Sequence, residues 1–267
     1  MCWTRGAAEA PETHVLFAHA TGFCGKVWRP VRARLPEFSS TIWDFRGHGR
    51  SVASRERRSW WEMADDVLAI HATVTRGPGA TRVVGAGHSM GGAALVMAEL
   101  VNPGSFDALV LIEPILFGPP YLPANDHPLV SLALRRRAVF ESRAGVEASY
   151  SSKPPFAAWD VDALAGYLDG GFIEDHGQVR LACQPTAEAA VFAASAVHAA
   201  WERIGEITIP VTILYGADTD TFEAGHAEVM GQRFANAVVE SVPDTGHFLP
   251  MERPDVVAAA VRNRVFS

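Results

Sequence analysis

Short runs of apolar, largely β-branched residues alternate along this chain with longer segments of helical periodicity. The runs typical of strands are 14–19, 41–44, 82–86, 108–112, 211–215 and 237–242. Because they are continuously apolar, we expect strands that are covered on both faces, as in a parallel sheet flanked by helices. The alternation therefore predicts an α/β fold with a doubly wound, mostly parallel sheet.

Two of the intervening helices have recognisable first turns. Ser59 and Glu62 fit a capping box, in which the serine hydroxyl and the glutamate side chain satisfy free backbone N–H groups. Apolar residues then recur at helical spacing and give one face to pack on a sheet. Pro254 suits the first turn of a last helix that places Val257 and Val261 inward.

The alternation stops between residues 115 and 206. This span contains proline-rich loops, the basic run Arg135-Arg136-Arg137 and several amphipathic helical segments, and we expect no strand in it. An insertion of this size in a regular α/β chain is typical of a lid. We therefore predict a core formed by residues 1–114 and 207–267, with residues 115–206 as a helical cap domain.

The sequence Gly87-His88-Ser89-Met90-Gly91 carries the strongest chemical signal. It follows a predicted strand and precedes a predicted helix, which is the context that the G-x-S-x-G arrangement requires. A serine on so sharp a turn has a strained backbone, and its neighbours two positions away must be small. The free N–H groups of the helix then point to the space above the hydroxyl. The pattern predicts a nucleophilic serine.

A nucleophilic serine needs a base, and the base needs a carboxylate to orient it. His247 lies between the last predicted strand and the last helix, and Asp220 lies shortly after the strand at 211–215. The chain order serine, aspartate, histidine is the order expected for a triad in this context. Asp218 and Glu113 are the alternatives for the acid, because Asp218 neighbours Asp220 and Glu113 directly follows another strand.

At this point the chain resembles the α/β-hydrolase-fold serine hydrolases, as an esterase-like member with a cap domain. Residues 44–51, DFRGHGRS, are similar to the D-x-R-G-H-G-x-S loop of that superfamily, and residues 246–247 with 252–254 resemble its C-terminal signature. His19-Ala20-Thr21-Gly22-Phe23 resembles its oxyanion loop, with Ala20 in place of the commoner glycine. The chain also has few residues before His14, so we expect one edge strand of the superfamily to be missing and residues 2–5 to supply a short one.

The resemblance implies a role for each matching residue. Ser89 would be the nucleophile, His247 the general base and then acid, and Asp220 the carboxylate that orients His247. The backbone N–H groups of Thr21 and Met90 would form the oxyanion hole, where charge develops in the transition state.

Other conspicuous residues have simpler interpretations. We expect His88 to be a packed, hydrogen-bonded core group and His19 to orient the oxyanion loop. We interpret Arg135-Arg136-Arg137 as a solvated helix face. The histidines lack ligand spacing, so we expect no metal site, and without a phosphate-binding loop we expect no cofactor.

Composition excludes several other functions. The 23 Lys and Arg against 30 Asp and Glu give a formal charge of −7, which argues against nucleic acid and anionic membranes as partners. Three scattered cysteines do not form a disulfide framework, and the first residues do not resemble a signal peptide. We expect a cytoplasmic protein that acts on a small molecule; the sequence leaves monomer and homodimer open.

Aromatic residues near the serine and in the cap favour a substrate with an apolar acyl or alcohol part. The candidates for binding it are Phe23, Trp28, Trp159 and Phe248. Hydrolysis of a carboxylic ester through an acyl-enzyme is the function we predict. The same triad could act on a lactone or on a C–C bond of a vinylogous diketone, or as a perhydrolase or acyltransferase. A non-catalytic ligand receptor on this scaffold is a further alternative.

Overall fold

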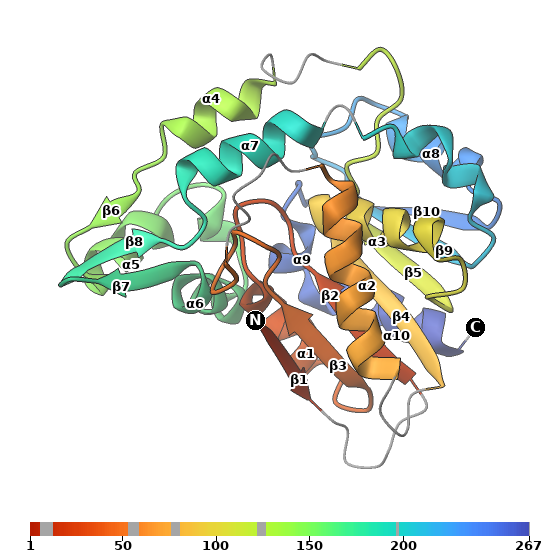
Figure 1. Ribbon diagram of the computed structural model, residues 1–267, viewed down its shortest axis with the longest axis horizontal. Helices are drawn as coiled ribbons and strands as arrows, with labels where there is room; N and C mark the ends of the chain where they lie inside the picture. Colours follow the sequence, from red (N-terminus) through yellow and green to blue (C-terminus); the bar gives the residue numbers. More distant parts are fainter. Residues whose placement is uncertain (6–12, 53–58, 76–80, 122–126, 196–197, 267) are drawn as a thin grey trace.

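The computed structural model describes residues 1–5, 13–52, 59–75, 81–121, 127–195 and 198–266 (Figure 1). At its centre is a seven-stranded sheet in the order β1-β3-β2-β4-β5-β9-β10. The strands are β1 (Cys2–Arg5), β2 (Thr13–Ala18), β3 (Ser39–Trp43), β4 (Arg82–His88), β5 (Ala108–Ile112), β9 (Val211–Gly216) and β10 (Ala237–Val242). Every neighbouring pair is parallel except β1 with β3. The predicted α/β class and the short strand at residues 2–5 are confirmed.

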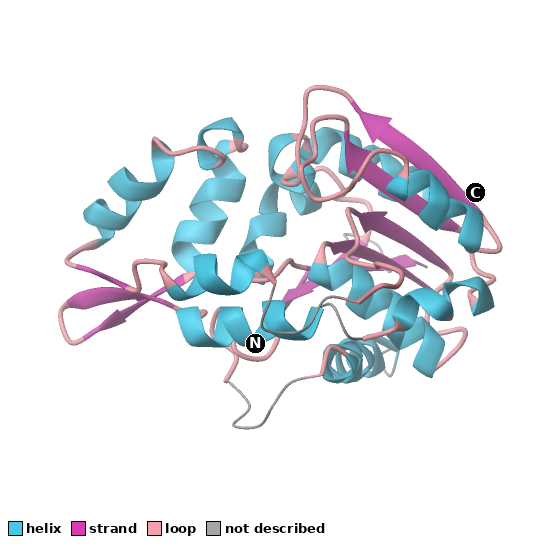
Figure 2. Cartoon of the chain, turned by 90° about the horizontal axis from the view of Figure 1, so that it is seen from above, coloured by secondary structure: helices cyan, strands magenta, loops and turns pink. Residues whose placement is uncertain are grey.

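Helices cover both faces of this sheet, as the view from above shows (Figure 2). On one face lie α2 (Trp61–Thr75), α3 (Met90–Val101) and α8 (His226–Arg233), which bury Leu95 and Met230 among others. On the other lie α1 (Arg29–Ala33) and α10 (Pro254–Phe266), which bury Val31, Val257 and Val261. With both faces covered, the central strands are apolar on both sides, which is why their sequences do not alternate.

Both helices start where predicted, although the Ser59 hydroxyl accepts from the N–H of Trp61 and not from the third helical N–H that the capping box predicts. The Ser59 hydroxyl accepts a hydrogen bond from the Trp61 N–H at 3.2 Å, and the Ser59 N–H donates to the Glu62 carboxylate at 3.4 Å. Helix α10 begins at Pro254, which has no N–H to leave unsatisfied in a first turn. The first turns of both helices therefore follow from local sequence alone.

The chain leaves the sheet after β5 and returns at β9, and we call the intervening residues 115–206 the insertion. Its helices are α4 (Pro128–Leu134), α5 (Arg143–Ser151), α6 (Val161–Gly170) and α7 (Pro185–Ser195), with 3-10 turns η3 (Phe156–Ala158), η4 (Ala200–Glu202) and η5 (Ile204–Glu206). Helices α4 and α7 pack side by side across one end of the sheet (Figure 1).

The prediction that the insertion lacks strands is wrong. Strands β6 (Val139–Phe140), β7 (Phe172–Asp175) and β8 (Gln178–Leu181) form a three-stranded antiparallel sheet in the order β6-β8-β7. The turn between β7 and β8 consists of His176 and Gly177, with φ of 49° and 81°. A two-residue turn with both φ positive matches the twist of a hairpin. The His-Gly pair was the signal for a hairpin in the sequence. The flanking strands were too short to show a clear strand pattern.

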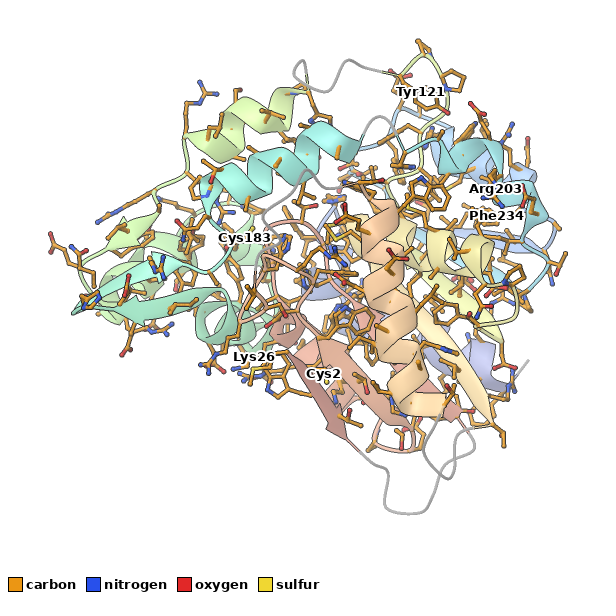
Figure 3. All side chains as sticks on the ribbon, in the orientation of Figure 1. Cys2, Lys26, Tyr121, Cys183, Arg203 and Phe234 are labelled. Carbon is orange, nitrogen blue, oxygen red and sulfur yellow. The ribbon has the colours of Figure 1, made fainter. Side chains whose placement is uncertain are left out.

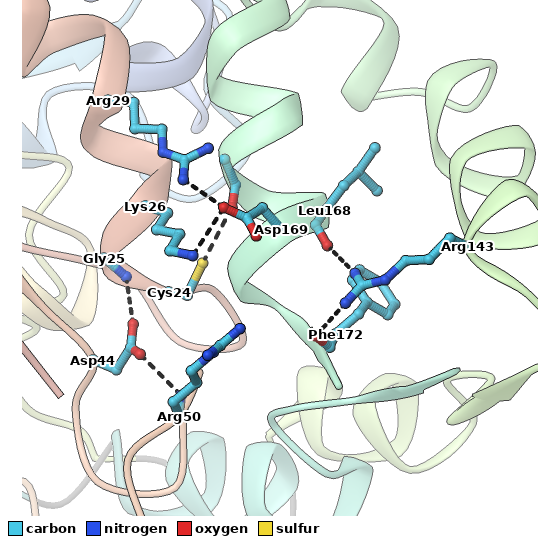
Figure 4. Close-up of polar contacts among 11 residues, drawn as sticks. Cys24, Gly25, Lys26, Arg29, Asp44, Arg50, Arg143, Leu168, Asp169 and Phe172 are labelled. Carbon is cyan, nitrogen blue, oxygen red and sulfur yellow. Dashed lines mark hydrogen bonds and ion pairs between the residues drawn. The ribbon is translucent and has the colours of Figure 1, made fainter. Parts of the chain in front are cut away.

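Helix α6 docks the insertion onto the core segment that follows β2 (Figure 4). Lys26, in the 3-10 turn η1 (Gly25–Trp28), places its Nζ 2.8 Å from the Asp169 carboxylate, which Arg29 also contacts. A Cβ on Gly166 would lie 2.2 Å from the Lys26 carbonyl oxygen, so only glycine permits this approach. The insertion is thus fixed against the segment that follows the predicted oxyanion loop.

Asp44, the first residue of the D-x-R-G-H-G-x-S loop, has a structural role (Figure 4). Its buried carboxylate accepts hydrogen bonds from the Gly25 N–H at 2.8 Å and the Arg50 N–H at 2.9 Å. Burial raises the pKa of this carboxyl, while the two N–H donors oppose the rise. The loop after β3 is therefore tied to the loop after β2, which fixes one wall of the site described below.

The three cysteines, Cys2, Cys24 and Cys183, all lie in the described residues and form no disulfide. Figure 3 labels Cys2 on β1 and Cys183 in the insertion, in separate parts of the molecule. Within the described ranges, no helix is long and apolar enough to cross a membrane.

His198 joins the end of the insertion to its beginning. Its Nε2–H donates to the Ile115 carbonyl at 3.1 Å, its Nδ1 accepts from the Ala200 N–H at 3.2 Å, and its ring stacks on Trp60. Burial lowers its pKa to about 4, although the bond to Ile115 opposes this. The ring is therefore neutral in the folded protein at pH values where the unfolded chain binds a proton.

This neutral histidine predicts a loss of stability on acidification. Between the unfolded pKa near 6.5 and the folded pKa near 4, the unfolded state binds one more proton at this site, so stability falls as pH falls. We expect His198→Gln to flatten the slope of unfolding free energy against pH by about 1.4 kcal/mol per pH unit. Urea unfolding of both proteins at several pH values from 7 to 5 measures it. Parallel curves would contradict the prediction.

Candidate active site

Ser89 occupies a strained turn between β4 and α3. Its φ of 55° and ψ of −115° lie in a region that side chains rarely adopt. A Cβ on Gly87 would lie 2.7 Å from the Gly91 carbonyl oxygen, and a Cβ on Gly91 would lie 2.2 Å from the Ala18 carbonyl oxygen. Both glycines are therefore required by backbone contacts, as the G-x-S-x-G pattern predicts. The serine side chain lines a cavity at the carboxyl ends of the strands.

His247 lies in the loop after β10 and lines the same cavity. Its Nδ1 is 2.8 Å from the Glu113 Oε2. A carboxylate accepts hydrogen bonds, so this contact places the proton on Nδ1 and leaves the lone pair on Nε2. An imidazole held in this tautomer can take a proton through Nε2.

The carboxylate beside His247 is Glu113, and the prediction that Asp220 orients His247 is wrong. Glu113 directly follows β5 and is fully buried. Its Oε1 accepts from the Gly216 N–H at 2.9 Å, and its Oε2 accepts from the Thr219 hydroxyl at 2.7 Å in addition to His247. Among the described residues, no hydrogen bond or ion pair joins Asp220 to His247.

The reason is the path of the loop after β9. Strand β9 is the neighbour of β5, so the ends of the two strands adjoin. Thr219 turns back to donate to Glu113, and Asp220 then faces the cavity as an exposed side chain of its wall. Asp218, the other alternative, is also exposed. The glutamate side chain that directly follows β5 therefore reaches the imidazole that the sequence paired with an aspartate of the loop after β9.

His88 holds the loop that carries His247. Its Nε2–H donates to the His247 carbonyl at 2.8 Å, and the two rings lie 4.8 Å apart between centroids. Burial, with the charge of His247 as a lesser cause, keeps the pKa of His88 well below its usual value. His88 is thus the buried, hydrogen-bonded group that we expected.

His19 fixes the peptide between Ala20 and Thr21. Its Nε2 accepts from the Phe45 N–H at 3.0 Å, and its Nδ1–H donates to the Ala20 carbonyl at 2.8 Å. Burial lowers its pKa to about 4, so the ring stays neutral. In a trans peptide the N–H points opposite to the C=O, so the N–H of Thr21 is directed away from His19. Ala20 and Thr21 both line the cavity.

Met90 is the first residue of α3, so its N–H has no acceptor within the helix. Ser89, directly before it, faces the cavity. The structure thus brings together Ser89, His247 and the segments of Thr21 and Met90. In the described part of the chain, Ser89 Oγ and His247 share no hydrogen bond, and such bonds in enzymes without ligand are often long until substrate is bound.

Comparison with known proteins agrees with this fold. The model of the alpha/beta hydrolase family matches residues 15–260. The chain belongs to the alpha/beta hydrolase family. It is 25% identical over 261 residues to 2-(acetamidomethylene)succinate hydrolase of Mesorhizobium japonicum, covering 93% of this chain and 86% of that protein.

Solved structures share the fold of this hydrolase. The peroxisomal alpha-beta-hydrolase Lpx1 from Saccharomyces cerevisiae has a TM-score of 0.85 at 19% identity, covering 98% of this chain and 80% of that one. The enol-lactonase from Burkholderia xenovorans LB400 has a TM-score of 0.72 at 20% identity, covering 100% and 96%. The family match and the related hydrolase of Mesorhizobium japonicum show that this chain is an enzyme of the family, as its sequence indicated.

The cavity of the hydrolase has a volume of about 790 Å³ and lies between the insertion and the core. Of the four predicted binding residues, Phe23 and Phe248 line it. The prediction is wrong for Trp28 and Trp159, which are buried behind the wall: Trp28 packs on Phe17, and Trp159 packs on Phe23 and Phe248. Large aromatic residues fill cores as readily as pockets, so composition did not separate the two.

Four charged residues of the cavity wall were not among the predicted site residues: Arg136, Arg137, Lys153 and Glu188. In the described residues, no group of three or more His, Cys, Asp or Glu side chains is placed to hold a metal ion.

Proposed function

We propose that this hydrolase cleaves carboxylic esters through an acyl-enzyme, with Ser89, His247 and Glu113 as its triad. The observation that carries the proposal is the 2.8 Å contact between His247 Nδ1 and the buried Glu113 carboxylate, in the cavity that Ser89 lines. That contact fixes the tautomer that a general base requires. The insertion would serve as the cap over the site.

The proposed reaction has two halves. The Ser89 oxygen attacks the ester carbonyl while its proton passes to Nε2 of His247. The tetrahedral oxyanion receives hydrogen bonds from the N–H groups of Thr21 and Met90, and the C–O bond to the alcohol then breaks as His247 returns the proton to the leaving oxygen. Water activated by His247 attacks the acyl-enzyme, which releases the acid and restores Ser89.

The aromatic wall favours a substrate with an apolar part. Phe23 and Phe248 lie beside the site, and Phe117, Phe140, Phe156 and Phe192 extend the wall into the insertion. Apolar walls with a few placed polar groups are typical of small-molecule sites. The acyl or alcohol part of the ester would bind against these rings.

A fluorophosphonate probe and a panel of 4-nitrophenyl esters of rising chain length test this proposal. We expect the probe to label the protein at Ser89, identified by peptide mass spectrometry, and the panel to release 4-nitrophenol. Under mild conditions the fluorophosphonate reacts with an activated serine and not with an ordinary serine hydroxyl. A protein inert to both the phosphonate and every ester would contradict hydrolysis and favour the receptor alternative.

A further inference from the structure

The basic run at residues 135–137 follows α4, and the structure divides it. Arg135 is exposed and does not line the cavity, as a solvated helix face predicts. Arg136 is turned inward and largely buried, and it lines the cavity that contains Ser89 and His247. Arg137 also lines the cavity, with its guanidinium 4.5 Å from the centroid of the Phe140 ring. The expectation of a solvated face is therefore wrong for Arg136.

Arg136 keeps donors free although it is buried. Its Nη1 donates to the Glu188 carboxylate, and its Nη2 donates to the hydroxyls of Tyr167 at 2.8 Å and Tyr150 at 3.3 Å. A guanidinium has five N–H groups, so two remain beyond these three contacts. Burial alone lowers the pKa of Arg136, but Tyr167 and Glu188 outweigh it and the net shift is upward, so the group stays charged.

The partners of Arg136 leave the wall suited to an anion. Glu188 contacts it through Oε2 only, so the carboxylate does not cover the guanidinium as a bidentate pair would. Tyr150 accepts from Arg136, so its own hydroxyl proton is available, and Tyr150 lines the cavity. These groups form a surface that presents hydrogen-bond donors.

The charges of the whole cavity favour an anion on the insertion side. Its cationic lining residues are Arg136, Arg137 and Lys153, all from the insertion, and its acidic ones are Glu188 and Asp220. Glu188 is paired with Arg136, and Asp220 belongs to the core loop after β9. Among the described residues, the insertion wall therefore carries two further cationic side chains, Arg137 and Lys153, for which no ion pair is found, in a chain whose formal charge is −7.

The guanidinium also lies close to the reacting centre. A Cβ on Gly22 would be 2.5 Å from Glu188 Oε1 and 3.2 Å from Arg136 Nη1, so the Arg136–Glu188 pair lies beside Gly22. Gly22 directly follows Thr21, whose N–H is proposed to bind the oxyanion. An anionic group at Arg136 would therefore be joined to the reacting carbonyl by a short chain. Long apolar acyl groups do not need a charged group so near the site.

We propose that the ester substrate carries a carboxylate, which binds Arg136 together with Tyr150 and Lys153 while its ester carbonyl lies at Ser89. This inference rests on the proposed esterase function and specifies its substrate class. A charge-assisted contact of this kind increases kcat/KM for an anionic ester about 10- to 100-fold over an uncharged analogue.

Matched pairs of esters test this inference. The monoethyl esters of succinic, glutaric and adipic acid carry the carboxylate on the acyl side, and their carboxamide analogues have the same shape without the charge. Acetylated glycolic acid and its amide place the same pair on the alcohol side. Release of ethanol, or of acetate for the second pair, gives kcat/KM for each. A preference for the anionic member in either series supports the proposal.

Variants separate binding from a structural role. The preference is the ratio of kcat/KM for the anionic ester to kcat/KM for its amide analogue. We expect Arg136→Gln to reduce this ratio toward one. We expect Glu188→Gln to increase it, because the guanidinium is then no longer neutralised. Arg135→Gln is the matched control, since it removes an adjacent charge of the same sign from outside the cavity. If Arg136→Gln does not fold, Glu188→Gln and Lys153→Gln still decide, with Lys153→Gln expected to lower the preference.

Two results would overturn the carboxylate subsite. One is a wild-type preference of one or less in both series. The other is an equal effect of Glu188→Gln on charged and uncharged esters, which is what a purely structural ion pair predicts. In either case the proposed function would still hold if the protein hydrolyses the uncharged esters and if the fluorophosphonate labels Ser89 and stops this hydrolysis.

Discussion

Ser89→Ala is expected to lower kcat for an activated ester about a million-fold. Without the hydroxyl no acyl-enzyme forms, and His247 and Glu113 have no nucleophile to activate. Residual hydrolysis above the rate in water would come from the N–H groups of Thr21 and Met90 and from substrate binding. The measurement is the initial rate of 4-nitrophenol release, together with loss of fluorophosphonate labelling.

The control for this substitution is Ser131→Ala. Ser131 is an exposed serine on α4, outside the cavity, and its loss should leave rate and labelling unchanged. Thermal unfolding of both variants checks that the strained turn survives, since alanine at position 89 must adopt the same positive φ. A rate for Ser89→Ala within about tenfold of wild type would remove Ser89 as the nucleophile.

Where the sequence predicted correctly, the cause was local. The strand at 108–112 is recognisable because five successive residues are buried on both faces. The turn at Ser89 is recognisable because Gly87 and Gly91 are the residues that backbone contacts at 2.7 Å and 2.2 Å permit. In both cases a few adjacent residues contain the whole physical constraint.

The identity of the carboxylate that meets His247 does not depend on adjacent residues alone. Sequence indicates that Glu113 and Asp220 both follow strands, but the one that meets His247 depends on how the loop after β9 folds. The bond from Thr219 to Glu113 directs that loop, and it joins residues 106 positions apart. Arg136 is similar, because its burial depends on Glu188 and Tyr167 from two other helices. Long-range partners of this kind leave no periodicity to detect.

The assignment of the carboxylate leads to the second large effect. We expect Glu113→Gln to lower kcat about 10⁴-fold, the size of loss seen when the acid of a serine triad becomes an amide. The glutamine amide can donate to Nδ1 of His247, which moves the imidazole proton to Nε2. In that tautomer Nε2 has no lone pair and cannot accept the Ser89 proton.

Asp220→Asn makes the same change of acid to amide at the position that the sequence favoured. We expect it to change kcat less than about tenfold, because among the described residues Asp220 makes no hydrogen bond or ion pair with His247. Steady-state rates of the two variants on one uncharged ester give the comparison, and thermal unfolding checks that the buried amide at 113 is tolerated.

Because Glu113 also accepts from Gly216 and Thr219, a partly unfolded Glu113→Gln protein would lose activity without identifying the acid. The tautomer of His247 then identifies the acid. In Glu113→Gln, the ¹⁵N chemical shifts of the imidazole should show that the proton has moved from Nδ1 to Nε2. A larger loss for Asp220→Asn, with Nδ1 still protonated in Glu113→Gln, would restore Asp220 as the acid and contradict the pairing at β5.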